Sequence, residues 1–295
     1  MLIMEQILEL NHNQSLTKNT LSLFAFFRTK DWLHILGLIF LGHAYSWDNG
    51  PFFRLSLALL IGGLYLAHGY TLNDIHDGQI KISISRAAAF SLSLLALFFC
   101  LVLSRLISIS TLFIVAAGHL SGFLYSAPPL RLKNKLWLDL IFNSLALSPL
   151  FLLGSAINNE PSLTIWAVFG LIFLYFIPIQ LIHQIQDKAI DITSGQKNTF
   201  QILGIEKTKN IISITLILYA FTNLFLWKLR VFSIFSALCG ITFSCALLLY
   251  MPAIKDKAME KDIQKDTLNK NIKSDARHIS IAYGLILLLS FWLQH

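Results

Sequence analysis

Residues 52–72 read FFRLSLALLIGGLYLAHGYTL, and Arg54 is the one charged side chain among them. A helix needs about 20 mostly apolar residues to cross the hydrocarbon core of a membrane. Only helices and closed barrels satisfy every backbone group in lipid, and a barrel strand would alternate polar and apolar residues. This stretch is therefore predicted to form a transmembrane helix.

The same pattern recurs along the chain. Of the 295 residues, 55% are hydrophobic and 13% are charged, whereas a soluble domain carries roughly 25% charged residues. We predict an all-α polytopic membrane protein with a cytoplasmic tail at residues 1–30 and a single transmembrane domain at 31–295. About nine spans are expected: Trp32–Trp47, Phe52–Leu72, Arg86–Leu106, Thr111–Ala127, Leu136–Ile157, Leu163–His183, Asn210–Leu229, Val231–Met251 and His278–Leu293.

The basic residues orient the chain. With a cytoplasmic N-terminus, the tail and the loops after the second, fourth, sixth and eighth spans hold 19 of the 23 Lys and Arg residues. This asymmetry follows the positive-inside rule and predicts a bacterial-type inner membrane protein. Topology and contact with anionic membrane lipid account for the net charge of +7, so no nucleic-acid partner is expected.

Two similar polar groups follow the second and sixth spans. The first contains Asn73, Asp77 and Lys81, and the second contains His183, Asp187 and Asp191. Each group has the spacing i, i+4, i+8, which places its members on one helical face. Because the two groups match and lie four spans apart, they suggest a weak internal duplication.

Carboxylate and amide oxygens are the ligands that magnesium prefers, and bound magnesium leaves positions for phosphate oxygens. Two such groups facing each other would hold metal ions that bridge a diphosphate and stabilise it as it leaves. The alternative is that Asp and Asn merely mark helix ends at the membrane surface. For one group that alternative is preferable, but two groups with matching spacing favour a metal site.

A basic turn lies between the two groups. Residues 125–135 read YSAPPLRLKNK, in which Pro128 and Pro129 end the fourth span and Arg131 and Lys133 follow. Cations beside two acidic groups suit the binding of phosphate. Taken alone, the segment is only a positively charged cytoplasmic loop.

Together these motifs resemble those of the UbiA-type intramembrane prenyltransferase superfamily. Asn73 and Asp77 match the family's first motif, N-x-x-x-D-x-x-x-D, while Asp187 and Asp191 match its second, D-x-x-x-D-x-x-x-D. The segment YSAPPLRLK is similar to the Tyr-and-basic segment of the branch with chlorophyll synthases and archaeal ether-lipid enzymes. The resemblance implies nine transmembrane helices, arranged as two similar helical halves around a central cavity.

The resemblance also implies an activity: a magnesium-dependent enzyme would ionise a prenyl diphosphate and transfer the prenyl chain to a lipophilic or aromatic acceptor. The implied metal ligands are Asn73, Asp77, Asp187 and Asp191. The implied catalytic residues are Asp77, Asp187, Asp191 and Tyr125. The implied diphosphate-binding residues are Arg86, Arg131, Lys133, Lys81 and Lys197.

Two positions depart from the family pattern. Lys81 replaces the last acid of the first motif, and His183 replaces the first acid of the second. A degenerate, non-catalytic member is therefore an alternative, as is a membrane terpene cyclase that uses the same ionising site. A transporter ranks lower because the charges gather at one membrane face rather than at its middle. A structural or assembly protein is the remaining class.

Overall fold

The computed structural model describes residues 26–46, 52–80, 84–157, 160–188, 191, 196–231 and 233–259. Within these ranges every regular element is a helix, which confirms the all-α class. The chain enters through α2 (Thr29–Trp32), the 3₁₀ turn η1 (Leu33–Leu36) and α3 (Gly37–Tyr45). It continues through α4 (Phe52–Asp77), α5 (Arg86–Ile107), α6 (Ile109–Ser126), η2 (Leu132–Asn134), α7 (Leu138–Leu147), α8 (Pro149–Ala156), α9 (Leu163–Gln186), α11 (Thr199–Lys228) and α12 (Ile234–Met259).

Six helical stretches in the described residues are long and apolar enough to cross a membrane, which supports an integral, multi-pass membrane protein. They agree with the second to seventh predicted spans, and the apolar part of α12, Ile234–Leu249, agrees with the eighth. The first predicted span is only the nine-residue α3 preceded by shorter turns. The ninth lies outside the described residues, so the count of nine and the two-half arrangement stay predictions.

Two of the long helices are interrupted, each at a residue that explains the break. The predicted fifth span is divided into α7 and α8 at Ser148 and Pro149, because proline lacks the amide donor that a continuous helix requires. Gly204 interrupts α11 with φ 75°, a conformation that glycine adopts without a steric penalty. Helix α11 therefore begins before the predicted span and bends five residues after its start.

The short helix α8 lies at the centre of the packing. Every residue from Pro149 to Ala156 is buried, and the helix contributes to two apolar clusters. One cluster joins it to α9, α11 and α12, and the other joins it to α3, α4 and α6. Helix α3 approaches it closely because Gly42 and Gly154 have no side chain: a Cβ on Gly154 would lie 2.1 Å from the Ile39 carbonyl oxygen.

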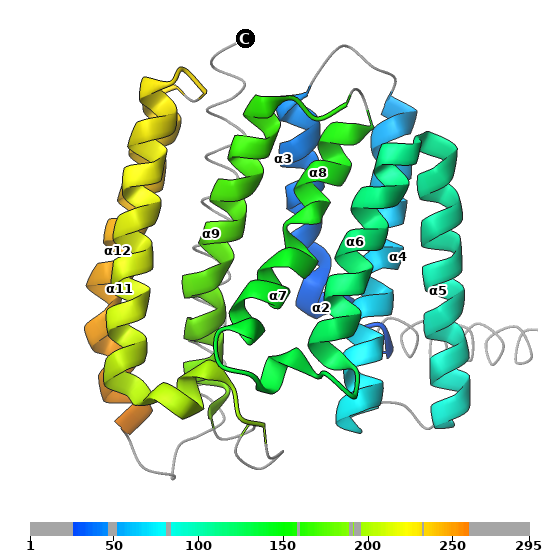
Figure 1. The fold of residues 1–295 in the computed structure, drawn as a ribbon, viewed down its shortest axis with the longest axis horizontal. Helices are drawn as coiled ribbons and strands as arrows, with labels where there is room; N and C mark the ends of the chain where they lie inside the picture. The colour runs from blue at the N-terminus through cyan, green and yellow to red at the C-terminus, as the bar shows by residue number, and fades with distance from the viewer. Residues whose placement is uncertain are drawn as a thin grey trace, which may run out of the picture.

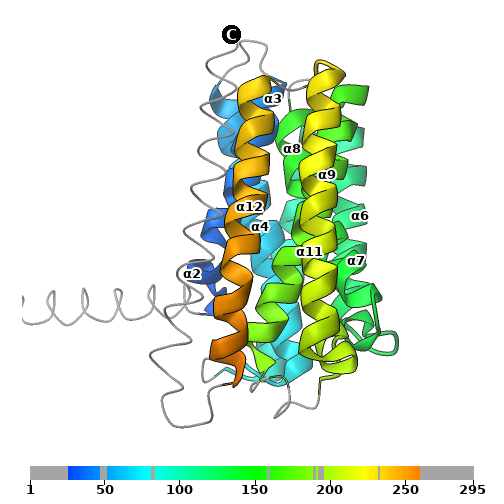
Figure 2. The same cartoon turned by 90° about the vertical axis from the view of Figure 1, so that its left-hand side faces the viewer.

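The polar segments singled out in the sequence meet at one end of this bundle. In Figure 1, the C-terminal end of α4, the turn between α6 and α7, and the connection from α9 to α11 all lie at the lower end. Figure 2 shows the same end after a quarter turn, with these segments still below the long helices. The helical packing therefore brings both acidic motifs and the basic turn to one face of the membrane domain.

Candidate functional site

The first motif occupies the last turn of α4, where Asn73 and Asp77 point to the same side. The side chain of Asp77 is 4% exposed, and its carboxylate lies against the basic turn that follows α6. Arg131 Nη2 donates to Asp77 Oδ1 over 2.7 Å. Ser126 Oγ donates to Asn73 Oδ1 over 3.1 Å. The fold therefore places the basic segment against the first motif.

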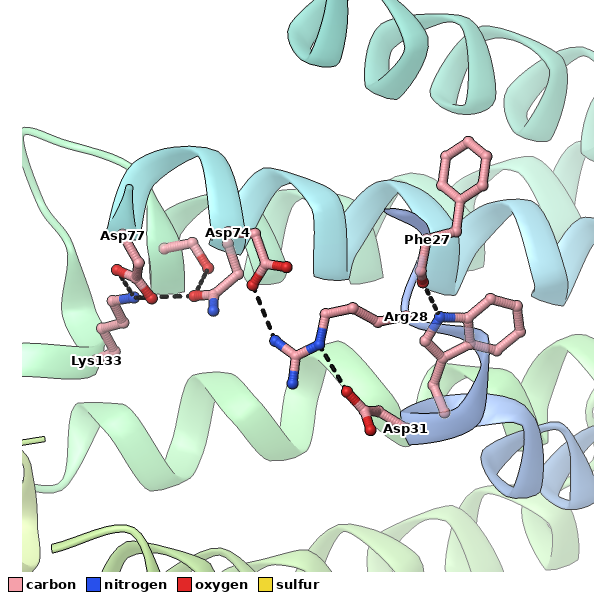
Figure 3. A network of polar contacts seen from close by, with 9 residues as sticks. Phe27, Arg28, Asp31, Asp74, Asp77 and Lys133 are labelled. Atoms are coloured by element: carbon pink, nitrogen blue, oxygen red, sulfur yellow. Dashed lines mark hydrogen bonds and ion pairs between the residues drawn. The ribbon is translucent and has the colours of Figure 1, made fainter. Parts of the chain in front are cut away.

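Lys133 makes the central contact of this group. Its ammonium lies 2.9 Å from Asn73 Oδ1 and 2.6 Å from Asp77 Oδ2, and it also donates to Asp77 Oδ1. Figure 3 shows the lysine reaching the end of α4 from the neighbouring segment. Only 3% of its side chain is exposed, and this burial lowers the pKa of Lys133, against the effect of its hydrogen bond to Asp77.

The second motif continues from the end of α9. The Asp187 amide donates to the His183 carbonyl, and the Asp191 amide donates to the Asp187 carbonyl, each over 2.9 Å. Burial raises the pKa of Asp191 to about 6, and the charge of Asp187 adds to the rise. The charges of Lys133 and Asp77 also act on the pKa of Asp191, so the first motif lies within electrostatic range of the second.

A buried carboxylate that the sequence analysis missed holds the second motif in place. Asp139, in the first turn of α7, is fully buried and accepts hydrogen bonds from the Leu140 and Thr199 amides, the Thr199 hydroxyl and Gln184 Nε2. Asn198, next to Thr199, donates to Asp191 Oδ2 over 2.7 Å. This network joins α7, α9 and the start of α11 directly behind Asp191.

Tyr125 lies near the end of α6, where a chain of side-chain amides orients it. Gln180 Nε2 of α9 donates to the Tyr125 hydroxyl over 3.4 Å, and Asn143 Nδ2 of α7 donates to Gln180 Oε1 over 3.0 Å. The tyrosine is thereby linked to two further helices at the level of the acidic motifs. Gln180 carried no motif that could have identified it from the sequence.

The remaining predicted cations are not part of these networks. Arg86 is exposed at the first residue of α5, and Lys197 is exposed just before α11. Among the described residues, the hydrogen bonds and ion pairs of Asn73 and Asp77 go to Ser126 and the basic turn rather than to these two cations. Lys81 lies outside the described residues, so its predicted contact with phosphate stays a prediction.

A second ion-pair cluster adjoins the first motif. Asp74, whose side chain is 6% exposed, accepts from Arg28 Nη1 over 2.9 Å, while Arg28 Nε donates to Asp31 Oδ2 over 2.7 Å. The guanidinium also lies 5.3 Å from the centre of the Tyr70 ring. Figure 3 shows this cluster beside the Lys133 contact, on the same side of α4 as Asp77. These contacts link α2 and the residue before it to α4.

Replacing Arg28 by alanine is expected to lower the free energy of unfolding by about 2–3 kcal/mol, because the buried Asp74 carboxylate then loses its charged partner. Thermal unfolding in detergent, followed by tryptophan fluorescence, measures this loss. Lys30→Ala is the matched control, since Lys30 is exposed two residues away. Equal unfolding temperatures for the two variants would contradict the assigned role of Arg28.

The donors suit a metal ion that shares its coordination with substrate. Among the described residues, no three His, Cys, Asp or Glu side chains gather closely enough to hold a metal by themselves. Magnesium usually binds through one or two carboxylates together with substrate phosphate oxygens. Asp187 and Asp191, one helical turn apart, fit that requirement. Asn73 and Asp77 carry suitable oxygens, but Lys133 already contacts those oxygens.

Comparison with known proteins gives one clear family match. A sequence model of the UbiA prenyltransferase family matches residues 35–271. Digeranylgeranylglyceryl phosphate synthase of Sulfurisphaera tokodaii is 28% identical over 202 residues, which cover 63% of this chain and 70% of that protein.

Two of the solved structures with the same fold are UbiA homologues. A UbiA homologue from Archaeoglobus fulgidus, bound to GPP and Mg2+, superposes with a TM-score of 0.73 and 19% identity, covering 90% of this chain and 99% of that one. The apo structure of a UbiA homologue from Aeropyrum pernix K1 gives a TM-score of 0.69 and 11% identity, covering 90% and 98%. At these identities the likeness concerns the fold.

Proposed function

The chain belongs to the UbiA prenyltransferase family, and from this premise we propose that it ionises a prenyl diphosphate and transfers the prenyl chain to a lipophilic or aromatic acceptor. One observation carries the proposal: two acidic motifs and a basic turn, far apart in sequence, converge at one end of the helical bundle. The Archaeoglobus structures with GPP or DMAPP and Mg2+ support the choice of substrate class and metal.

The proposed division of labour follows the charges. Asp187 and Asp191, together with Asn73 and Asp77, would hold magnesium against the diphosphate, and the bound metal would supply positive charge to the leaving group. Arg131 and Lys133 are close enough to Asp77 to reach the same diphosphate with charge-assisted hydrogen bonds. Arg86, Lys197 and Lys81 are proposed as further, more peripheral cations.

Bond breaking defines what these residues must do. As the allylic C–O bond breaks, its electron pair moves to the diphosphate, and cations already held in position stabilise the growing negative charge. The prenyl cation that remains needs an electron-rich surface that excludes water. The ring of Tyr125, whose hydroxyl is held by Gln180, is proposed to provide part of that surface.

The experiment uses the purified protein in lipid nanodiscs with magnesium and prenyl diphosphates of several chain lengths. Acceptors are supplied as a membrane lipid extract and, because of the Sulfurisphaera relative, as a prenylated glyceryl phosphate. Mass spectrometry is expected to detect a prenylated acceptor and release of inorganic diphosphate, both abolished by EDTA. Diphosphate release with a cyclised hydrocarbon would indicate a terpene cyclase instead, and absence of both products would refute the proposal.

A further inference from the structure

The first motif already contains a cation of the protein's own. The Lys133 ammonium has three oxygen acceptors, Asn73 Oδ1 and both oxygens of Asp77, which match the three donors that an ammonium group carries. The side chain is 3% exposed, and its partners come from a helix more than fifty residues earlier in the chain. Figure 3 shows the Lys133 ammonium at the Asp77 carboxylate, at the end of α4.

These oxygens are the ones that the family resemblance assigns to magnesium. A magnesium ion binds oxygen at about 2.0–2.1 Å, so a metal held by Asn73 and Asp77 would overlap the volume that Lys133 Nζ fills. The two positive groups would also repel each other at short range in a poorly solvated setting. Metal and ammonium therefore cannot share the first motif.

The local charge balance also disfavours a metal ion at the first motif. Asp77 is contacted by two cations, because Arg131 Nη2 lies 2.7 Å from the oxygen that Lys133 also contacts. The adjacent carboxylate, Asp74, is engaged by Arg28 over 2.9 Å. One carboxylate with two cations attracts an anion rather than a further divalent cation. The second motif contributes two carboxylates, Asp187 and Asp191, and the charge of Asp187 raises the pKa of Asp191, as expected where negative charge accumulates.

We propose that the Lys133 ammonium occupies the metal position between Asn73 and Asp77, and that it leaves this position only when a diphosphate binds. The ammonium then moves from Asp77 to a diphosphate oxygen, and a divalent ion takes its place between Asn73 and Asp77. The flexible four-carbon stem of lysine allows this exchange, and the negative charge of the diphosphate offsets the added metal. The second motif binds its metal without this condition. The inference rests on the proposed function and adds to it an order of binding.

Counting bound Mn2+ tests the exchange directly. Equilibrium dialysis of the detergent-purified protein, with EPR of the bound ion, is expected to give one Mn2+ per wild-type chain without pyrophosphate and two with it. Lys133→Gln, and as a second variant Lys133→Met, should bind two without pyrophosphate because the position is vacated. Asp77→Asn should bind one under both conditions.

Lys135→Gln is the matched control: Lys135 is exposed two residues further along the same turn, and this variant should behave as wild type. Two Mn2+ ions in the wild type without pyrophosphate, or a single ion in both Lys133 variants, would overturn the exchange. A wild-type count that stays at one with pyrophosphate would overturn it as well. The two proposals can fail independently. If the Mn2+ counts are as expected but no prenylated product forms, the proposed reaction is refuted while the exchange at Lys133 stands.

Discussion

Replacing Asp187 by asparagine is expected to lower kcat/KM for a prenyl diphosphate by roughly a thousandfold, which corresponds to about 4 kcal/mol of lost transition-state stabilisation. Asparagine keeps the size of the side chain and one ligand oxygen but removes the negative charge that the divalent ion requires. The measurement is the rate of diphosphate release in nanodiscs at saturating magnesium. The unfolding temperature should change little, because Asp187 lies at the end of α9 rather than inside the apolar clusters.

Lys188→Gln provides the control for this experiment. Lys188 follows Asp187 directly in the chain and is exposed, so the substitution changes one charge in the same segment without removing a proposed ligand. Its turnover is expected to remain within about twofold of wild type. Near wild-type turnover in Asp187→Asn would remove the second motif from the proposed metal site.

The second large effect concerns Asp139. Its replacement by alanine is expected to lower the free energy of unfolding by about 4 kcal/mol, because the buried donors of Thr199 and Gln184 lose their acceptor. The substitution should also affect the site. Asn198 adjoins Thr199 in the chain and donates to Asp191, so a displaced Thr199 would leave Asp191 less well positioned. The Mn2+ affinity measured without pyrophosphate should therefore fall together with stability.

Ser144→Ala is the control for Asp139→Ala. Ser144 lies on the same helix as Asp139, and its buried hydroxyl has no hydrogen-bond partner among the described residues. Ser144→Ala should therefore change unfolding by less than about 1 kcal/mol. The positioning role of Asp139 would be refuted if Asp139→Ala had the same free energy of unfolding as Ser144→Ala. It would also be refuted if Asp139→Ala kept the wild-type Mn2+ affinity.

Much of the fold could be predicted because the relevant information is local. A long apolar run, such as residues 52–72, specifies a membrane helix wherever it is placed, since lipid offers its backbone no other partner. Spacing of four residues likewise places Asp187 and Asp191 on one helical face in any α-helix. Pro128 and Pro129 end α6 for the same local reason, and the basic turn follows directly.

The break between α7 and α8 could not be predicted from the sequence. The fifth span was expected to be continuous from Leu136 to Ile157, although the fold divides it at Pro149 and buries all of α8. Proline is tolerated in membrane helices when neighbouring groups satisfy the freed backbone, so its presence alone did not predict a division. The burial of α8 results from packing on both of its faces, which no single segment determines.

The sequence by itself determined the membrane class, most of the spans and the spacing within each acidic motif. Only the tertiary structure decided which of these groups meet: Lys133 with Asp77, Arg28 with Asp74, and Asp139 with Thr199. It also separated Lys133, which is buried in the site, from Lys197, which is exposed, although both were predicted to bind diphosphate. The physical reason is that helical periodicity fixes the face on which a side chain lies, whereas packing between distant helices fixes what that face contacts.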